Sequence, residues 1–231
     1  ITDFIKPGIS TDEINNLCHE FQTNAGAKPA PLNYKGFPKS VCTSINHVVC
    51  HGIPGKKILK EGDIINIDVT PILNGWHGDT SRMYYVGKVS LKAQKLVETT
   101  YEALIRGIEK VKPGNTLGDI GHAIQEFAEK KKYSIVREFC GHGLGEVFHD
   151  SPSILHFGKP GEGDVLQAGM FFTIEPMINI GDSRVKVLSD GWTAVTSDKS
   201  LSAQFEHSIG VTEKGYEIFT KSKKKFTFPP Y

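Results

Sequence analysis

The sequence has little of several features that mark common protein classes. Lysine and arginine number 27 and aspartate and glutamate 26, so 231 residues carry a formal net charge of only +1. This balance excludes the strong basic excess that is typical of nucleic-acid binders and membrane-surface proteins. No apolar run approaches the ~20 residues of a membrane span, and the first residues form no signal-peptide pattern. We therefore expect no specific nucleic acid and no membrane among the partners.

Cysteine is also scarce. The four cysteines are too few and too irregularly spaced for a disulfide framework, and no two of them form a CxxC pair. We therefore expect a cytoplasmic protein in a reducing compartment. The chain does contain 9 histidines and 24 glycines, so the question is whether the histidines cluster with carboxylates.

Two stretches recur in the same order, 106 to 107 residues apart. Residues 6–14 (KPGISTDEI) resemble residues 112–120 (KPGNTLGDI), and each copy is a Pro-Gly turn followed by a helix start with the spacing of a capping box. Residues 60–71 parallel residues 167–176 in the same way, because each has a Gly turn, a β-rich strand, an acid and a proline. Three helices are predicted, over about Thr11–Thr23, Ser90–Val111 and Leu117–Lys132.

The repeat predicts a duplicated αβ unit. No Pro/Ser-rich linker or charge block separates the copies, so we expect one α/β (α+β) domain over residues 1–231, with halves at about 1–110 and 111–215. Residues 221–231 begin with a lysine-rich run. The leading interpretation is a solvated basic tail, and the alternative is a weak, transient contact with the ribosome or RNA.

A hairpin is predicted at Asn74-Gly75, the strongest short-range signal for a two-residue type I′ turn. It would join strands Ile64–Thr70 and Trp76–Tyr85. The alternation of the first strand places three apolar side chains on the face that should be the core, namely Ile65, Ile67 and Val69.

The same hairpin brings two acids together on the other face. In its register Asp68 faces Ser81 and Asp79 faces Thr70, which makes the acids diagonal neighbours about 7–8 Å apart. Two carboxylates this close ionise together only with cations between them. Unrelated, solvated carboxylates are the alternative.

The second half supplies further acids. Glu175 ends the predicted strand Phe171–Glu175, at the position equivalent to Asp68. Glu206 lies in another predicted strand, over residues 202–209, and shares its face with Gln204 and Ser208.

A histidine completes the set. His142 stands between glycines in residues 140–145 (CGHGLG), which would leave its imidazole unobstructed. Four oxygen ligands and one nitrogen ligand suit a pair of divalent ions such as Mn, Fe, Co or Zn. Dinuclear metal-dependent hydrolysis is therefore the favoured chemistry.

Six ordered motifs then resemble those of the type I methionine aminopeptidases, from about Lys6 to Thr212. They are KSVCTSIN at 39–46, VVCHGIP at 48–54, HGDTS at 77–81, CGHG at 140–143, FTIEPM at 172–177 and SAQFEH at 202–207. The resemblance implies a pita-bread fold, in which two pseudo-twofold-related αβ halves form a curved antiparallel sheet with outer helices.

The resemblance also implies roles for individual residues. Two divalent ions (Co, Mn, Fe or Zn) would be held by Asp68, Asp79, His142, Glu175 and Glu206. Glu175 would accept the proton of the attacking water, His149 would stabilise the oxyanion, and His51 would orient the substrate amide. The methionine side chain would contact Tyr34, Phe37, Cys42, Phe148 and Trp192, and a monovalent cation would bind near Asn46, Val48 and Ser202.

The implied activity is removal of the N-terminal methionine from nascent proteins and peptides with a small second residue. Separately, the lack of an obvious apolar interface in the sequence favours a monomer. The alternatives are an X-Pro aminopeptidase or prolidase on the same fold, and a non-catalytic peptide-binding relative that lost its metals. The family usually carries a helix before the turn at residues 6–8, and this chain begins almost at that turn. We therefore expect the first helix to be missing.

Overall fold

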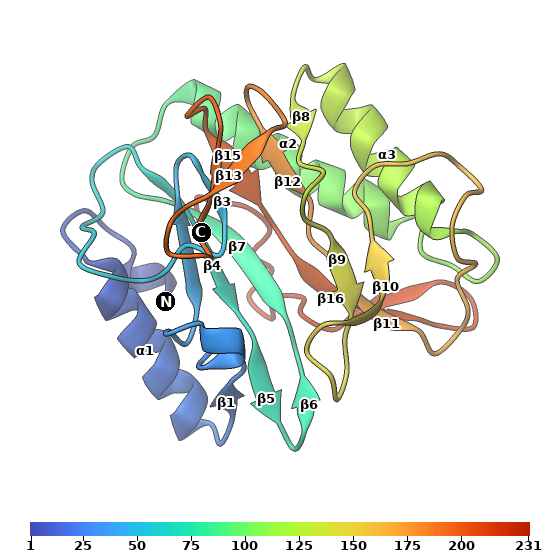
Figure 1. The fold of residues 1–231 in the computed structure, drawn as a ribbon, viewed down its shortest axis with the longest axis horizontal. Helices are drawn as coiled ribbons and strands as arrows, with labels where there is room; N and C mark the ends of the chain where they lie inside the picture. The colour runs from blue at the N-terminus through green and yellow to red at the C-terminus, as the bar shows by residue number, and fades with distance from the viewer.

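The helices of the protein lie outside its strands in a computed structural model that describes all 231 residues (Figure 1). The three predicted helices are confirmed, with ends that differ from the prediction by at most three residues. The α-helices are α1 (Thr11–Asn24), α2 (Leu91–Ile108) and α3 (Leu117–Lys130), and the 3₁₀ helices are η1 (Thr2–Phe4) and η2 (Tyr34–Gly36).

The two halves begin with the same local structure. At α1 the Glu13 carboxylate accepts the backbone N–H of Ser10 at 2.8 Å, and at α3 the Asp119 carboxylate accepts that of Thr116 at 2.7 Å. Both are capping boxes, which satisfy N–H groups that a helix start leaves unpaired. The same N-caps form the equivalent backbone bridges Ser10–Ile58 and Thr116–Val165.

The first half is built on the predicted hairpin. Its three-stranded sheet, in the order β2-β4-β7, contains β2 (Cys42–Ile45), β4 (Ile64–Val69) and β7 (Thr80–Tyr85). A smaller sheet, β1-β5-β6, continues the hairpin with β1 (Lys28–Pro29), β5 (Pro71–Leu73) and β6 (Trp76–His77). Asn74 and Gly75 have φ angles of 52° and 87°, as a type I′ turn requires, and Asp68 pairs with Ser81. The predicted register is therefore confirmed.

The second half carries the larger sheet, and every strand pair in it is antiparallel. Its order β10-β9-β11-β16-β17 contains β9 (Gly141–Gly143), β10 (Asp150–Ile154), β11 (Phe171–Ile174), β16 (His207–Val211) and β17 (Tyr216–Ile218). Two small sheets complete the fold. One contains β8 (Ser134–Ile135), β12 (Met177–Asn179) and β15 (Ser202–Gln204). The other contains β3 (Val48–Cys50), β13 (Val185–Val187) and β14 (Ala194–Thr196).

Both faces of β4 are buried, so the expectation of a single core face is wrong. Ile65 and Ile67 are buried as predicted, in a cluster with Ile14 and Cys18 of α1. Ile64, on the opposite face, is fully buried in the main core that α2 and α3 cover, and Asn66 beside it is 2% exposed. The second half of the molecule covers this face, which an isolated hairpin would leave to solvent.

Two strands that the sequence predicts as continuous are interrupted, one at Asp79 and one at Glu206. At these positions the backbone bonds to the other half of the molecule instead of continuing its own ladder. The Asp79 N–H donates to the Ser208 hydroxyl at 2.9 Å, and the Glu206 N–H donates to the Ser81 carbonyl at 3.1 Å. The hydrogen bonds at these breaks therefore join the two halves at two of the predicted metal ligands.

The C-terminal residues correct the expectation of a wholly solvated tail. The lysines of residues 221–225 are exposed, as predicted. The last residues instead pack on the first half, where the Tyr231 hydroxyl donates to the Met83 carbonyl at 3.0 Å and the Tyr231 ring meets Tyr84 edge-on at 5.3 Å. Separately, none of the helices has both the length and the apolar character needed to span a bilayer.

Candidate metal centre

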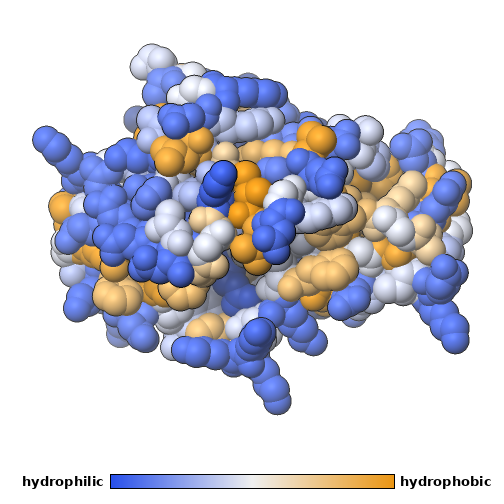
Figure 2. Space-filling view, turned by 90° about the horizontal axis from the view of Figure 1, so that it is seen from below, coloured by the Kyte–Doolittle hydropathy of each residue, from blue (hydrophilic) through white to orange (hydrophobic).

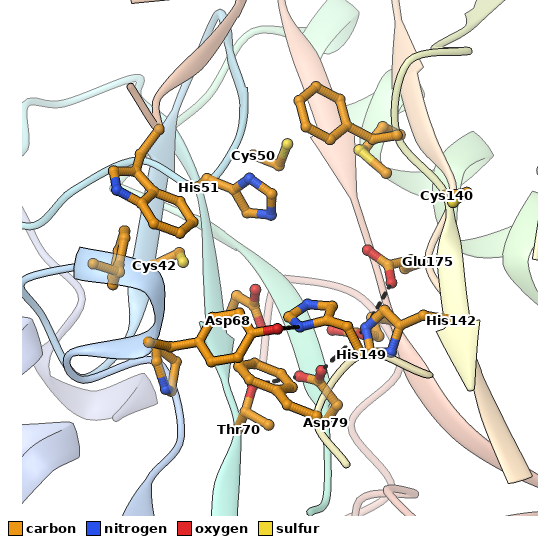
Figure 3. Close-up of a pocket in the computed structure, with 18 of the residues that line it drawn as sticks. Cys42, Cys50, His51, Asp68, Thr70, Asp79, Cys140, His142, His149 and Glu175 are labelled. Atoms are coloured by element: carbon orange, nitrogen blue, oxygen red, sulfur yellow. Dashed lines mark hydrogen bonds and ion pairs between the residues drawn. The ribbon is translucent and has the colours of Figure 1, made fainter. Parts of the chain in front are cut away.

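One cavity, of about 230 Å³, is lined by every residue that the sequence predicts for the metals, the chemistry and the methionine side chain. Figure 3 shows how the labelled members of this set point toward one another. Asp68 comes from β4, His142 from the middle of β9, and Glu175 directly follows β11. Both halves of the molecule therefore contribute side chains to the cavity.

Three of the predicted ligands form a tight group. Asp79, His142 and Glu206 each offer one ligand atom, and these atoms lie within 4.8 Å of one another. The Nε2 atom of His142 is 3.7 Å from Asp79 Oδ2 and 3.6 Å from Glu175 Oε1. A single divalent ion has N and O ligands at about 2.0–2.2 Å from its centre, so this spacing suits a shared ion.

The four carboxylates oppose one another's ionisation. Burial raises the pKa of Glu175 to about 8, with the charge of Asp79 adding to the effect, and burial raises the pKa of Asp79 to about 7. The pKa values of Asp68 and Glu206 are raised well above their ordinary values by burial and by the neighbouring acids. Asp68 Oδ1 is also buried without a hydrogen-bond partner. These residues fit divalent cations, which would neutralise the charge and satisfy the unpaired oxygen.

The tautomer of His142 agrees with a ligand role. Its Nδ1 atom lies 3.0 Å from the Gly143 carbonyl, which can only accept a hydrogen bond. Nδ1 therefore carries the proton, and the lone pair of Nε2 faces the acids. Burial also lowers the pKa of His142, which keeps the ring neutral. This is the form in which an imidazole binds a metal.

Comparison with known proteins decides the family. Residues 1–213 match the model of metallopeptidase family M24. This chain belongs to that family. It is 64% identical to the methionine aminopeptidase of Rickettsia prowazekii, over 100% of this chain and 90% of the relative. The crystal structure of methionine aminopeptidase from Rickettsia prowazekii has a TM-score of 0.95 to it, at 64% identity, covering 95% of this chain and 89% of that one.

The pita-bread fold with its pseudo-twofold-related halves is confirmed by these neighbours. A prolidase from Pyrococcus furiosus also has this fold, with a TM-score of 0.76 at 23% identity over 96% of this chain and 58% of that one. At such low identity the likeness shows the fold alone.

Two further residues of this M24 protein, neither predicted from the sequence as part of the site, hydrogen-bond to the predicted metal ligands. Thr173 accepts the backbone N–H of His142 at 3.0 Å and donates to Glu175 Oε1 at 2.9 Å. The backbone N–H of Glu175 donates to Nε2 of the fully buried His156 at 3.1 Å. Thr173 and Glu175 are two residues apart and so share a face of the strand, which is a signal that could have found Thr173.

Two more side chains that hydrogen-bond to the predicted ligands could have been predicted from the sequence. Thr70 donates to Asp79 Oδ1 at 2.7 Å, and the hairpin register already placed these residues opposite each other. Gln204 donates to Glu175 Oε2 at 3.1 Å, and the alternation of residues 202–209 placed Gln204 on the face of Glu206. Such partners orient carboxylate ligands and tune their basicity.

The glycines beside His142 were expected to leave its imidazole unobstructed, and the structure shows a further role for them in strand packing. They allow neighbouring backbones to approach, because a Cβ at Gly141 would overlap the Thr173 carbonyl and one at Gly143 the Ser151 carbonyl. They therefore set the packing of β9 between β10 and β11, and this packing places His142.

Gly143→Ala is expected to lower the free energy of unfolding by about 2–3 kcal/mol, because a methyl group cannot enter a closely packed strand pair without moving it. Urea denaturation would measure the change. The matched control is Gly145→Ala, since a Cβ there would meet only Trp76, at an ordinary 3.5 Å. Equal stability of the two variants would show that the close approach at Gly143 is unimportant.

Aromatic rings form the apolar wall of the cavity in the M24 protein. Phe37 meets Trp192 edge-on with ring centroids 5.2 Å apart, and Tyr34 lies 4.9 Å from Phe148. Cys42 is 7% exposed on the same cavity, and burial raises the pKa of its thiol, which stays neutral. A wall of aromatic carbon and sulfur suits a thioether side chain.

The residues predicted for a monovalent cation also come together in part. The Ser202 N–H donates to the Asn46 carbonyl at 2.8 Å, and Asn46 has a left-handed φ of 56°. Val48 begins β3 two residues later.

Proposed function

We propose that this M24 protein is an aminopeptidase that uses two divalent ions to remove the N-terminal methionine of nascent proteins and peptides with a small second residue. The main support for this proposal is that the acid cluster and the aromatic and sulfur wall line one cavity. The named methionine aminopeptidases that match nearly the full chain support this activity over the X-Pro and the non-catalytic alternatives.

The proposed ligands of the two ions are Asp68, Asp79, His142, Glu175 and Glu206. Mn, Fe, Co and Zn all suit this donor set. When bound, such ions lower the pKa of a water molecule and polarise the scissile carbonyl.

The protein's own groups then move and hold protons. Glu175 is the proposed general base, because its buried carboxylate lines the cavity beside the other proposed metal ligands and could accept the proton of the attacking water there. His149 is proposed to donate to the oxyanion that forms on the substrate carbonyl, and His51 to orient the amide. Both histidines line the cavity, and the ring of His149 is 4.3 Å from that of His142.

Several finer points belong to the same proposal. We expect residues 1–231 to act as one catalytic domain with halves at about 1–110 and 111–215, and a monovalent cation to bind near Asn46, Val48 and Ser202. A cytoplasmic location suits the four free thiols. We expect a monomer. Figure 2 shows one face of the molecule, on which hydrophobic residues gather in the middle and toward one side, with hydrophilic residues around them. The exposed lysines of residues 221–225 would make any transient ribosome contact.

A two-peptide assay tests the activity. With added Mn or Co, the protein is expected to cleave Met-Ala-Ser and to leave Ala-Pro-Ala intact. Turnover of Ala-Pro-Ala instead would favour an X-Pro enzyme, and binding without turnover of either peptide would favour a non-catalytic relative. EDTA should abolish the cleavage, and replacement of the metal should restore it.

A further inference from the structure

A strained turn borders the cavity. Within residues 33–36, Asn33 has a φ of 67°, Lys35 of 47° and Gly36 of 90°. Left-handed backbone is unfavourable for residues with a side chain, and it persists where the surroundings determine it. Here the Asn33 N–H donates to the Phe37 carbonyl at 2.8 Å, and the Phe37 N–H donates to the Tyr34 carbonyl at 2.9 Å. The turn therefore fixes the backbone from which the Tyr34 side chain projects into the cavity.

The Tyr34 side chain extends to His149. The Tyr34 hydroxyl lies 3.0 Å from His149 Nδ1, as the dashed line in Figure 3 marks, and it has no other hydrogen-bond partner. The Tyr34 ring also packs against Phe148. Because Phe148 precedes His149 in the chain, one tyrosine contacts both residues of this loop through different parts of its side chain.

Two neighbouring imidazoles thus have different partners. The rings of His142 and His149 are 4.3 Å apart. Nδ1 of His142 faces a carbonyl, a pure acceptor, whereas Nδ1 of His149 faces a hydroxyl, which can donate. In a neutral imidazole, the partner of one nitrogen decides which nitrogen carries the proton.

We propose that Tyr34 is a positioning residue whose hydroxyl donates to Nδ1 of His149 and so holds the proton of that ring on Nε2. The two imidazoles then have opposite tautomers. His142 presents a lone pair from Nε2 to the acid cluster, and His149 presents an Nε2–H donor to the substrate. This inference rests on the proposed function, because the donor matters for an oxyanion. It gives Tyr34 a role beyond lining the methionine pocket.

Tyr34→Phe separates the two roles, since it keeps the ring and removes the hydroxyl. We expect kcat for Met-Ala-Ser to fall about three- to tenfold, the effect of one hydrogen bond, while KM changes less than twofold. Tyr216→Phe is the matched control and should change neither constant, because Tyr216 lies on the edge strand β17 and is exposed. A change confined to KM would overturn the proposal and leave Tyr34 as pocket lining.

A double-mutant cycle tests whether Tyr34 acts through His149. In a His149→Ala background, Tyr34→Phe is expected to have no further effect on kcat. The same three- to tenfold loss in that background would overturn the proposal.

Imidazole ¹⁵N NMR gives a readout that needs no catalysis. Wild-type protein should show His149 protonated on Nε2 alone, and Tyr34→Phe should show a mixture of tautomers. An Nδ1–H tautomer in the wild type would overturn the positioning role. Failure of the wild type to cleave Met-Ala-Ser would instead refute the proposed function and leave the NMR result to be judged separately.

Discussion

Glu206→Gln is expected to lower kcat for methionyl peptides by about 10²–10³-fold, the usual effect of removing one group that stabilises charge in a transition state. Glutamine keeps the shape of the side chain and removes its charge. Glu206 is 2% exposed, and with Asp79 and His142 it forms the group whose spacing suits a divalent ion. Peptide cleavage and calorimetric titration with Mn²⁺ would measure both the activity and the metal affinity, which should fall together.

Without metal, the same substitution should increase the stability of the fold. Burial and three neighbouring acids raise the pKa of Glu206 well above its ordinary value, so its charged form destabilises the fold without metal. Glu206→Gln should therefore unfold at higher urea concentration than the wild type in EDTA. The control Glu213→Gln, at the exposed turn between β16 and β17, should change neither quantity. Undiminished metal-dependent cleavage by Glu206→Gln would remove Glu206 from the ligand set.

The second large effect is an unusual dependence of metal-free stability on pH. Glu175 and Asp79 have pKa values of about 8 and about 7 in the folded protein, raised mainly by burial, against about 4 in an unfolded chain. Between about pH 8 and pH 6.5 the folded state therefore takes up protons that the unfolded state does not. The free energy of unfolding should therefore rise by about 2–4 kcal/mol as the pH falls through this window, since each extra bound proton contributes about 1.4 kcal/mol per pH unit.

Below about pH 6.5 the histidines reverse the trend. Burial lowers the pKa of His51 to about 4, of His156 to about 3 and of His207 to about 4, so these rings gain protons in the unfolded chain first. Metal-free protein should thus be most stable near pH 6.5. Urea denaturation at several pH values in EDTA would show this maximum.

Manganese provides the control for this pH dependence. Bound metal keeps the carboxyls deprotonated, so the metal-loaded protein should show no rise between pH 8 and pH 6.5. In EDTA, Glu175→Gln should also flatten the rise, because it removes one of the titrating groups. A metal-free protein whose stability falls steadily from pH 8 downward would contradict the buried acid cluster.

Much of the site could be predicted from local rules. The Asn74-Gly75 turn determines the hairpin register, and the register alone places Asp68, Asp79 and Thr70 together. The capping boxes and the repeat spacing likewise predict where each half begins. These features depend on residues close in the chain, which a sequence displays directly.

What the sequence could not predict depends on contacts between distant segments. The strand breaks at Asp79 and Glu206 exist because the opposite half offers hydrogen-bond partners there. The bond from Tyr34 to His149 joins residues that are 115 positions apart. It also requires left-handed backbone at Lys35, a residue type that gives no signal for it.

The hydrogen bonds at these strand breaks also keep the proposed ligands together, because the ligands come from distant segments of the chain. Asp68 and Asp79 belong to the first copy, whereas His142, Glu175 and Glu206 belong to the second. Neither set alone surrounds the cavity, because the acids of the first segment lie on one side of it and the histidine and acids of the second on the other. Loosening the contact between the two segments would therefore separate the proposed ligands without changing any of them.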